Sequence, residues 1–147
     1  MLALVLRVLI VCELFLYATL AVCIFRLSIA GAVLCALAGV LMLRMGVSGL
    51  TFALSVYYGV PSAGLGWWRR LALFFGEYAA FAVNFVLISP FESVWMGPDH
   101  LPAGNSRPPV LLIHGYGCSR AAWWYLRRRL EAAGWTVATI SLEPLYT

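Results

Sequence analysis

The run PPVLLIHGYG, residues 108–117, is typical of a buried β-strand that ends in a glycine-rich turn. The four apolar residues at 110–113 suit a strand that is covered on both faces. Gly115 and Gly117 then free the backbone at the point where the strand ends. Loops of this kind present backbone N–H groups, which stabilise a developing oxyanion. The sequence therefore predicts a strand at 110–113 and an oxyanion-type turn formed by His114, Gly115, Tyr116 and Gly117.

A helix and a second strand are expected after this turn. Ser119 suits the N-cap of a helix at about 120–133, and Gly134 stands where helices commonly place a C-terminal glycine. β-branched residues then predict a strand at 135–142. Two strands joined by a helix should pair in parallel. Because one β-α-β unit is too small to bury a stable core, the predicted α/β piece is incomplete.

The composition is that of a membrane protein. Of the 147 residues, 63% are hydrophobic and 11% are charged, and the mean hydropathy is +0.91. The net charge of +4 comes from arginines alone, and these are spread along the chain. Nucleic-acid binding needs a clustered basic face, so it is not expected. Arg127, Arg128 and Arg129 are expected on the solvated face of the helix at 120–133.

The apolar residues gather in the first 91 positions. Two runs, 8–25 and 27–43, are each long enough to cross a bilayer as a helix. Alanine and glycine in the second run let helices approach closely, which favours a hairpin. Two further segments, 46–60 and 71–91, suit interfacial or spanning helices. The sequence therefore predicts a membrane region at 1–91 whose partner is the lipid bilayer.

The arginines predict how this region is oriented. All but one of those in the membrane region fall on one side of the predicted hairpin: Arg7, Arg44, Arg69 and Arg70 against Arg26. The positive-inside rule then places the N-terminus in the cytoplasm.

The segment 71–91 leaves two arrangements open. It is long enough to span, yet it carries Glu77 and Asn84 on one helix face. If the segment lies on the bilayer, the soluble part after it is cytoplasmic, which is the arrangement we expect; if it spans, that part faces the other side. Glu13 also interrupts an apolar run, and no basic residue at helical spacing offers it a partner. We expect it to be a helix-packing or near-interface carboxylate.

Proline and glycine mark 92–109 as a linker, after which 110–147 forms the α/β piece.

The four cysteines show no metal-ligand spacing, and the first three lie inside apolar segments. Neither a metal nor a cofactor is expected. A dinucleotide or phosphate loop is also disfavoured, because Arg120 stands where the third glycine should be and the chain has no lysine.

The segment 107–146 resembles the opening of an α/β-hydrolase domain of the bacterial lipase and esterase branch. In that family the third strand ends in a His-Gly turn, matched here by His114-Gly115. The resemblance implies that the backbone N–H of Tyr116 helps to hold the oxyanion of the tetrahedral intermediate, and that His114 is structural. The membrane helices, Glu92 and the run 95–98 (Trp-Met-Gly-Pro) also look like a set of proteobacterial membrane-attached hydrolases. It therefore implies the inner membrane of a bacterium.

The catalytic residues of that family are not found here. No G-x-S-x-G nucleophile elbow occurs, and the only histidines, His100 and His114, are not where the catalytic base is expected. Ser119 is expected to cap a helix, and Cys118 to pack.

We therefore expect an α-helical membrane region followed by an incomplete α/β-hydrolase-like piece. The chain would be the N-terminal portion of a membrane-attached serine ester hydrolase that acts on an ester or lipid substrate. It would supply the anchor and the oxyanion turn, and would be inactive alone. The alternative is a small, non-enzymatic membrane interaction protein whose partner pairs with the open edge of the strand at 110–113.

Overall fold

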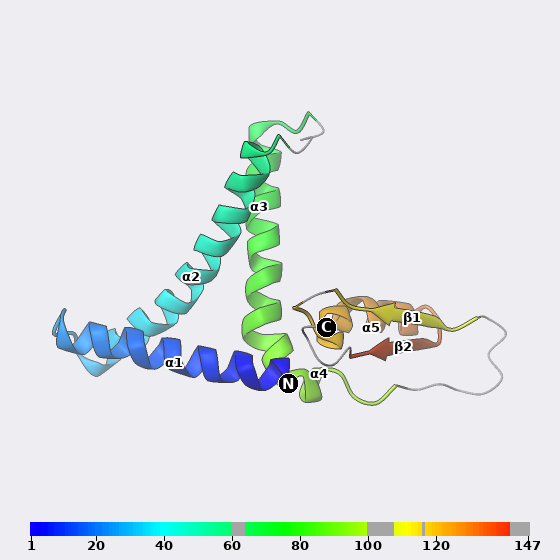
Figure 1. Ribbon diagram of the computed structural model, residues 1–147, viewed down its shortest axis with the longest axis horizontal. Helices are drawn as coiled ribbons and strands as arrows, with labels where there is room; N and C mark the ends of the chain where they lie inside the picture. Colours follow the sequence, from blue (N-terminus) through cyan, green and yellow to red (C-terminus); the bar gives the residue numbers. More distant parts are fainter. Residues whose placement is uncertain (60–63, 100–107, 116, 142–147) are drawn as a thin grey trace. The chain divides into compact units, whose positions relative to one another are not determined.

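The computed structural model describes residues 1–59, 64–99, 108–115 and 117–141. These residues form two compact units. The helical unit comprises 8–83, and the C-terminal unit comprises 84–147 together with the first seven residues of the chain. Figure 1 labels the elements of both units.

Long apolar helices make up the first two thirds of the chain. They are α1 (Leu2–Cys23), α2 (Ile29–Tyr57) and α3 (Trp67–Ala82). Beyond α3 the helical path continues through η1 (Val83–Ile88), η2 (Ser89–Phe91) and α4 (Glu92–Trp95). Three segments, Leu2–Cys23, Ile29–Tyr57 and Trp67–Trp95, are long and apolar enough to cross a membrane. The expectation of helices that could cross a membrane is therefore confirmed, by length and composition.

Two of the expected helix boundaries differ in the structure. The segments 27–43 and 46–60 were predicted as separate helices, but α2 runs unbroken from Ile29 to Tyr57. Glycine and arginine near residue 45 do not interrupt it, because a backbone in an apolar environment keeps its internal hydrogen bonds. Likewise, α1 begins at Leu2 and not at residue 8, so Arg7 lies inside the helix.

Helices α1 and α2 pack through one face of α2. Ala32, Ala36, Val40 and Arg44 recur every four residues along this face and are all buried. A Cβ added at Gly39 would lie only 2.6 Å from the ring of Tyr17. Gly39 thus leaves room for the Tyr17 ring where the two helices meet.

Glu13 of α1 forms an ion pair with Arg44 of α2. Arg44 also donates a hydrogen bond to the carbonyl of Val40, at 3.3 Å. No basic residue at helical spacing within α1 offers this partner, and the pair agrees with the expectation of a helix-packing carboxylate. The partner lies 31 positions away and comes from the next helix. An apolar surrounding favours such pairing, because a lone charge there is costly.

The helix after α3 changes its winding twice. Residues 83–88 form a π-helix, and 89–91 form a single 3₁₀ turn. Pro90 explains the change, because it lacks an N–H group and its ring opposes the carbonyl four residues earlier. The hydroxyl of Ser89 donates to Oδ1 of Asn84 at 3.3 Å within the same turn. The segment 71–91 is therefore not one regular α-helix.

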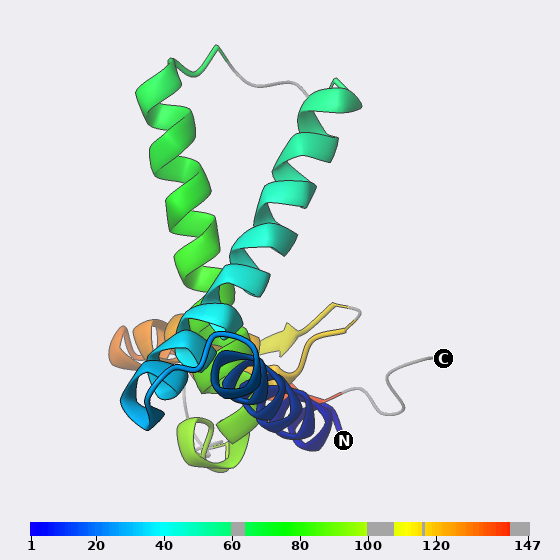
Figure 2. The same cartoon turned by 90° about the vertical axis from the view of Figure 1, so that its left-hand side faces the viewer.

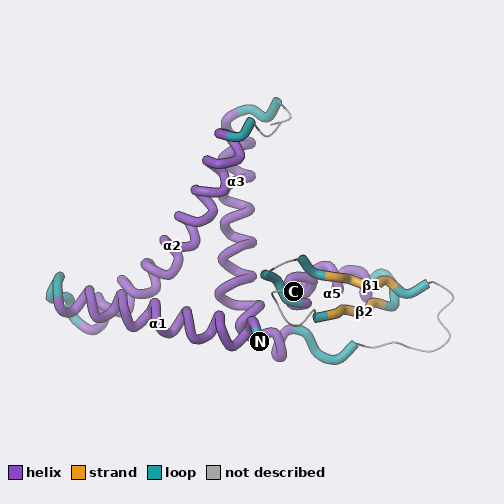
Figure 3. The backbone as a smooth tube through the Cα atoms, viewed as in Figure 1, coloured by secondary structure: helices purple, strands orange, loops and turns teal. Residues whose placement is uncertain are grey.

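The C-terminal unit contains a parallel two-stranded sheet. Strand β1 (Val110–Ile113) pairs with β2 (Val137–Ile140), with Val110 opposite Val137. Between them lie η3 (Arg120–Trp123) and α5 (Trp124–Ala132). Figure 3 shows the two strands side by side with this helical connection between them in the chain. The predicted β-α-β order and parallel pairing are confirmed.

The sheet is covered on one face within the described residues. Val137 is fully buried, whereas Leu111 and Ile113 are 50% and 54% exposed. These exposures fit a single β-α-β unit, which is too small to cover both faces of its sheet. A small core of Ile88, Met96 and Ala121, with Trp124 against it, packs η1 and the end of α4 against η3 and α5. Met96 belongs to the segment 92–109, which was expected as a linker. The first residues of that segment therefore pack in the core of the unit.

Candidate functional site

A cavity of about 220 Å³ lies where both parallel strands of the C-terminal unit end. His114 follows β1 and Ser141 follows β2, and both line it. The carboxyl edge of a parallel sheet is where α/β proteins place their ligands. The other lining residues come from the turn before η3, from η3 and α4, and from the start of the chain: Cys118, Ser119, Arg120, Glu92, Ser93, Met1, Leu2, Ala3 and Arg7.

The glycine-rich turn closes one side of this cavity. The N–H of Cys118 donates to the carbonyl of Gly115 at 3.2 Å, which closes a tight turn. Gly117 has a φ of +68°, a conformation that favours glycine because a Cβ would be strained there. The structure thus brings His114, Gly115 and Gly117 together at the end of β1. Tyr116, the predicted oxyanion donor, lies outside the described residues, so its role stays a prediction.

His114 is buried and contacts the turn. Its Nδ1 lies 3.0 Å from the carbonyl oxygen of Gly115. A carbonyl can only accept, so this contact requires the proton on Nδ1. The ring is therefore oriented by the backbone of the turn, as a structural histidine would be.

Ser119 caps the helical connection, as predicted. Its hydroxyl accepts a hydrogen bond from the N–H of Ala121 at 3.3 Å. The residue is buried, and its φ and ψ are extended, which is typical of an N-cap. Gly134 ends the same connection with a φ of +81°, so the predicted C-terminal glycine is also confirmed. The predicted helix at 120–133 begins with a 3₁₀ turn before α5.

Positive charge reaches the cavity from two distant parts of the chain. Nε of Arg120 lies 3.0 Å from Oε1 of Glu92. Arg7 donates from Nε to the carbonyl of Pro90 at 2.6 Å, and its guanidinium lies 5.9 Å from the centre of the Phe91 ring. The first turns of α1 therefore belong to the site. No local pattern predicts this contact, because residues 7 and 90 are 83 positions apart.

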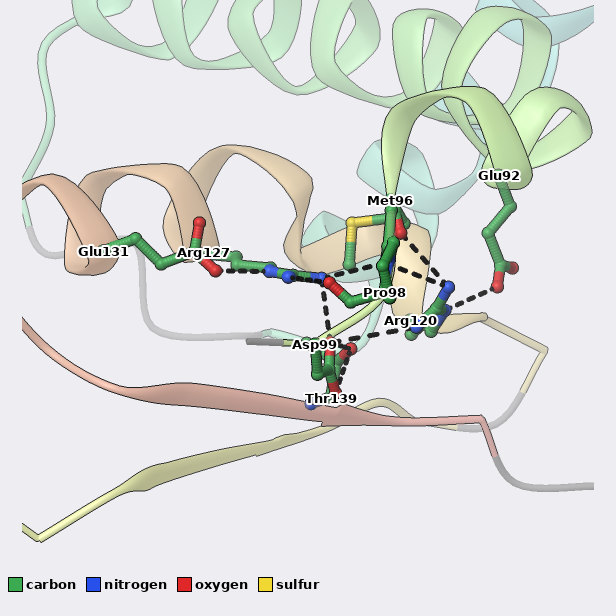
Figure 4. A network of polar contacts seen from close by, with 9 residues as sticks. Glu92, Met96, Pro98, Asp99, Arg120, Arg127, Glu131 and Thr139 are labelled. Carbon is green, nitrogen blue, oxygen red and sulfur yellow. Dashed lines mark hydrogen bonds and ion pairs between the residues drawn. The ribbon is translucent and has the colours of Figure 1, made fainter. Parts of the chain in front are cut away.

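An ionic cluster behind the cavity fastens the segment that follows α4. We call it the Asp99 cluster; Figure 4 shows its members, which are Glu92, Asp99, Arg120, Arg127, Glu131 and Thr139. Oδ2 of Asp99 accepts from the backbone N–H of Thr139 at 2.7 Å, and its Oδ1 accepts from the Thr139 hydroxyl at 3.0 Å. Arg127 pairs with Asp99 at 2.8 Å. Residues 97–99 are thereby tied to both α5 and β2.

The charge of Asp99 is set by these contacts. Burial raises the pKa of the carboxyl, but the two hydrogen bonds from Thr139 lower it, and Arg127 and Arg120 lower it further. The lowering effects win, so the pKa lies below its ordinary value. Asp99 is therefore a carboxylate at neutral pH and holds both arginines.

The structure corrects the expectation for one of the three arginines of α5. Arg127 was predicted on the solvated face, yet it is buried, pairs with Asp99, and donates to the carbonyl of Pro98 at 2.8 Å. Arg127 also pairs with Glu131, four residues later on the same helix. This i, i+4 spacing is the one local pattern that could have indicated that Arg127 is paired. Arg128 and Arg129 are exposed, as predicted.

Within the described residues, no group of three His, Cys, Asp or Glu side chains could hold a metal ion. No family model, curated protein or solved structure matches the chain.

Proposed function

We propose that this chain is the N-terminal portion of a membrane-attached serine ester hydrolase of the α/β-hydrolase type. It supplies the membrane anchor and the oxyanion turn for the hydrolysis of esters with apolar acyl chains. The observation that carries the proposal is the cavity at the carboxyl ends of β1 and β2, bounded by a glycine turn that leads into a capped helical connection. In such a site preorganised N–H donors face the position where negative charge develops.

The residues of the turn have separate roles in this proposal. The backbone N–H of Tyr116 donates to the oxyanion, and Gly117 permits the tight turn that presents it. His114 holds the turn through the carbonyl of Gly115. Removing one such donor typically costs about 2.7–4 kcal/mol of transition-state stabilisation.

The nucleophile and its base are not supplied by these 147 residues, which contain no G-x-S-x-G motif. We therefore expect the chain alone to hydrolyse p-nitrophenyl octanoate no faster than buffer does. Hydrolysis that a Ser119→Ala change abolished would contradict the proposal, because Ser119 would then be a nucleophile and not a helix cap.

The anion-binding role of the turn can be tested without catalysis. Decanoate carries an apolar chain and a carboxylate, and so resembles the product of ester hydrolysis. We expect the chain in nanodiscs to bind decanoate, and Gly117→Val to weaken binding by about tenfold because valine disfavours a φ of +68°. Gly97→Ala is the control, because a Cβ at that glycine meets nothing within 4 Å. Equal binding by wild type and Gly117→Val would contradict the assignment of the turn.

The contact between Arg7 and Pro90 limits the membrane topology that we propose. The two residues touch, so they lie on the same side of the membrane. The chain must then cross the bilayer an even number of times between them. Of the three apolar segments, at most two therefore cross.

We propose α1 and α2 as the crossing pair. The alternative of a spanning segment at 67–95 would leave Arg69 and Arg70 on the side opposite Arg7, against the positive-inside rule. With α1 and α2 crossing, only Arg26 lies outside. The segment that begins with Trp67 and Trp68 then starts at the cytoplasmic surface, where exposed tryptophans anchor helices. The C-terminal unit is cytoplasmic in this arrangement, at the inner membrane of a bacterium.

The uncovered sheet face favours a second candidate function, that of a non-enzymatic membrane interaction protein. Leu111, Ile113 and Ile140 are 50%, 54% and 40% exposed, so a partner could cover them. Limited proteolysis separates the two candidates. Resistance of residues 110–141 in the isolated chain would indicate a self-sufficient module, whereas rapid cleavage would indicate that further sheet is needed.

A further inference from the structure

A second cavity, of about 300 Å³, lies between α2 and α3 in the helical unit. Figure 2 shows these two helices standing apart near the segment that joins them. The rings of Phe52, Phe74 and Phe81 form much of the wall. Three polar side chains also line it: Ser48, Thr51 and Glu77.

Glu77 is the charged group of this cavity. It makes no hydrogen bond or ion pair within the part of the helical unit that the structure describes. The other carboxylate of the unit, Glu13, is neutralised by Arg44. The nearest arginine along α3 is also engaged, because Nε of Arg70 donates to the carbonyl of Leu65 at 2.9 Å. Glu13 is therefore paired, whereas Glu77 is exposed and lines the cavity with no cationic partner among the described residues.

The rest of the lining offers acceptors and ring faces. The hydroxyl of Thr51 donates to the carbonyl of Ser48 at 2.8 Å, so its oxygen keeps lone pairs that can accept a hydrogen bond. The rings of Phe52 and Phe74 meet edge to face, with centroids 5.7 Å apart. Ring faces attract organic cations, also at exposed sites. Carboxylate, hydroxyl oxygen and aromatic rings are together suited to an ammonium ion.

We propose that the cavity between α2 and α3 binds an ammonium group carried on an apolar body, such as an arylalkylamine, with Glu77 as its counter-ion. No arginine lines this cavity among the described residues, so a ligand that also carries a phosphate would lack a partner. The volume, at the small end of the range for organic ligands, suits one ring and a short chain.

The test compares a cation with its uncharged isostere. Phenethylammonium and propylbenzene have the same shape, with an ammonium in one where the other has a methyl group. Binding of each labelled compound to the full chain in nanodiscs is measured by equilibrium dialysis, with empty nanodiscs as the blank. We expect the wild type to prefer the cation by about tenfold or more, and Glu77→Gln to remove that preference.

Two variants make the result specific. Glu131→Gln removes an equal charge from an exposed position in the C-terminal unit, and should leave the preference unchanged. Glu77→Asp keeps the negative charge and should retain most of the preference for the cation. Helical content by circular dichroism shows that each variant is folded. Equal binding of both compounds by the wild type, or an unchanged preference in a folded Glu77→Gln, would overturn the proposal.

Discussion

Asp99 connects parts of the chain that are far apart in sequence. It receives two hydrogen bonds from Thr139, 40 positions away, and an ion pair from Arg127 of α5. Arg120 of the same cluster reaches Glu92 of α4 and the carbonyl of Met96 at 3.2 Å. Charged groups therefore hold the side wall of the candidate site. Removing one partner of a pair would leave the other charge partly buried and unpaired, which is destabilising.

Truncating Arg127 should loosen the C-terminal unit. Arg127→Ala leaves the carboxylate of Asp99 without its closest charge, and we expect a loss of about 2 kcal/mol in the free energy of unfolding. Urea unfolding followed by tryptophan fluorescence measures it, because Trp124 lies in the adjacent core. Arg128→Ala is the matched control; it removes an exposed contact with the ring of Trp124 and should cost less than about 1 kcal/mol. Equal effects of the two changes would contradict the role of the Asp99 cluster.

The stability of the C-terminal unit should depend on the protonation of Asp99. Its pKa is lower in the folded state than in the unfolded state, so the unfolded state binds the proton more readily. The stabilisation is complete above the unfolded pKa of about 3.9 and is lost as the pH falls through the lower folded pKa. We expect the difference in urea midpoint between wild type and Asp99→Asn to be constant from pH 7 to 5 and to disappear at lower pH. A gap that persists to pH 2 would show that Asp99 acts in another way.

The single-residue predictions succeeded where the signal was local. Ser119 and Gly134 were correctly placed at the two ends of the helical connection, because caps depend on adjacent backbone groups. The burial of Arg127 was missed, because its partner Asp99 is 28 positions away and no pattern in the sequence links them.

At the scale of elements, one glycine determines how closely α1 and α2 approach. The ring of Tyr17 occupies the space that a side chain at Gly39 would need. The buried face that runs from Ala32 to Arg44 then lines up along the same contact. The ion pair between Glu13 and Arg44 lies toward the far end of that face.

Filling this space should separate the helices. Gly39→Leu places its Cβ within 2.6 Å of the Tyr17 ring, and we expect a thermal midpoint in detergent lower by several degrees because over-packing costs about 1–3 kcal/mol. The second change Tyr17→Ala should restore part of the loss. Gly46→Leu is the control, since a Cβ there meets nothing within 4 Å. Fluorescence-detected size exclusion after heating gives the midpoints; equal loss at positions 39 and 46 would contradict the packing described.

Element types were predicted better than element limits. The strands followed from runs of aliphatic and β-branched residues, and both formed within their predicted ranges. The break predicted after residue 43 did not form, because Gly46 and Gly49 are weak helix formers in water but are tolerated in an apolar surrounding. The turn at the candidate site was predicted from its glycines, whereas the arrival of Arg7 depends on a contact across 83 positions.

At the scale of the whole molecule, membrane crossing and the site are linked by the contact between Arg7 and Pro90. If α1 and α2 cross as proposed, the turn between them is exposed outside the cell. The connection after α2 and the C-terminal unit are then both in the cytoplasm.

Cysteine labelling tests this topology. Single-cysteine variants carry Leu27→Cys, Tyr58→Cys or the native Cys118, with the other cysteines changed to alanine. An impermeant maleimide applied to intact cells should label position 27 alone, and all three after lysis. Labelling of position 58 without 27 would indicate that α2 and α3 cross instead. Labelling of Cys118 in intact cells would contradict a cytoplasmic C-terminal unit.

The most direct test of the ester hydrolase proposal is fluorophosphonate labelling of the native gene product in membranes. The probe reacts with an activated serine, and an antibody against residues 110–141 identifies the product and allows its intact mass to be measured. We predict a labelled protein heavier than the 16.2 kDa of these 147 residues, with the label on the serine of a G-x-S-x-G peptide. An unlabelled product of 16.2 kDa would contradict the proposal and favour the interaction protein.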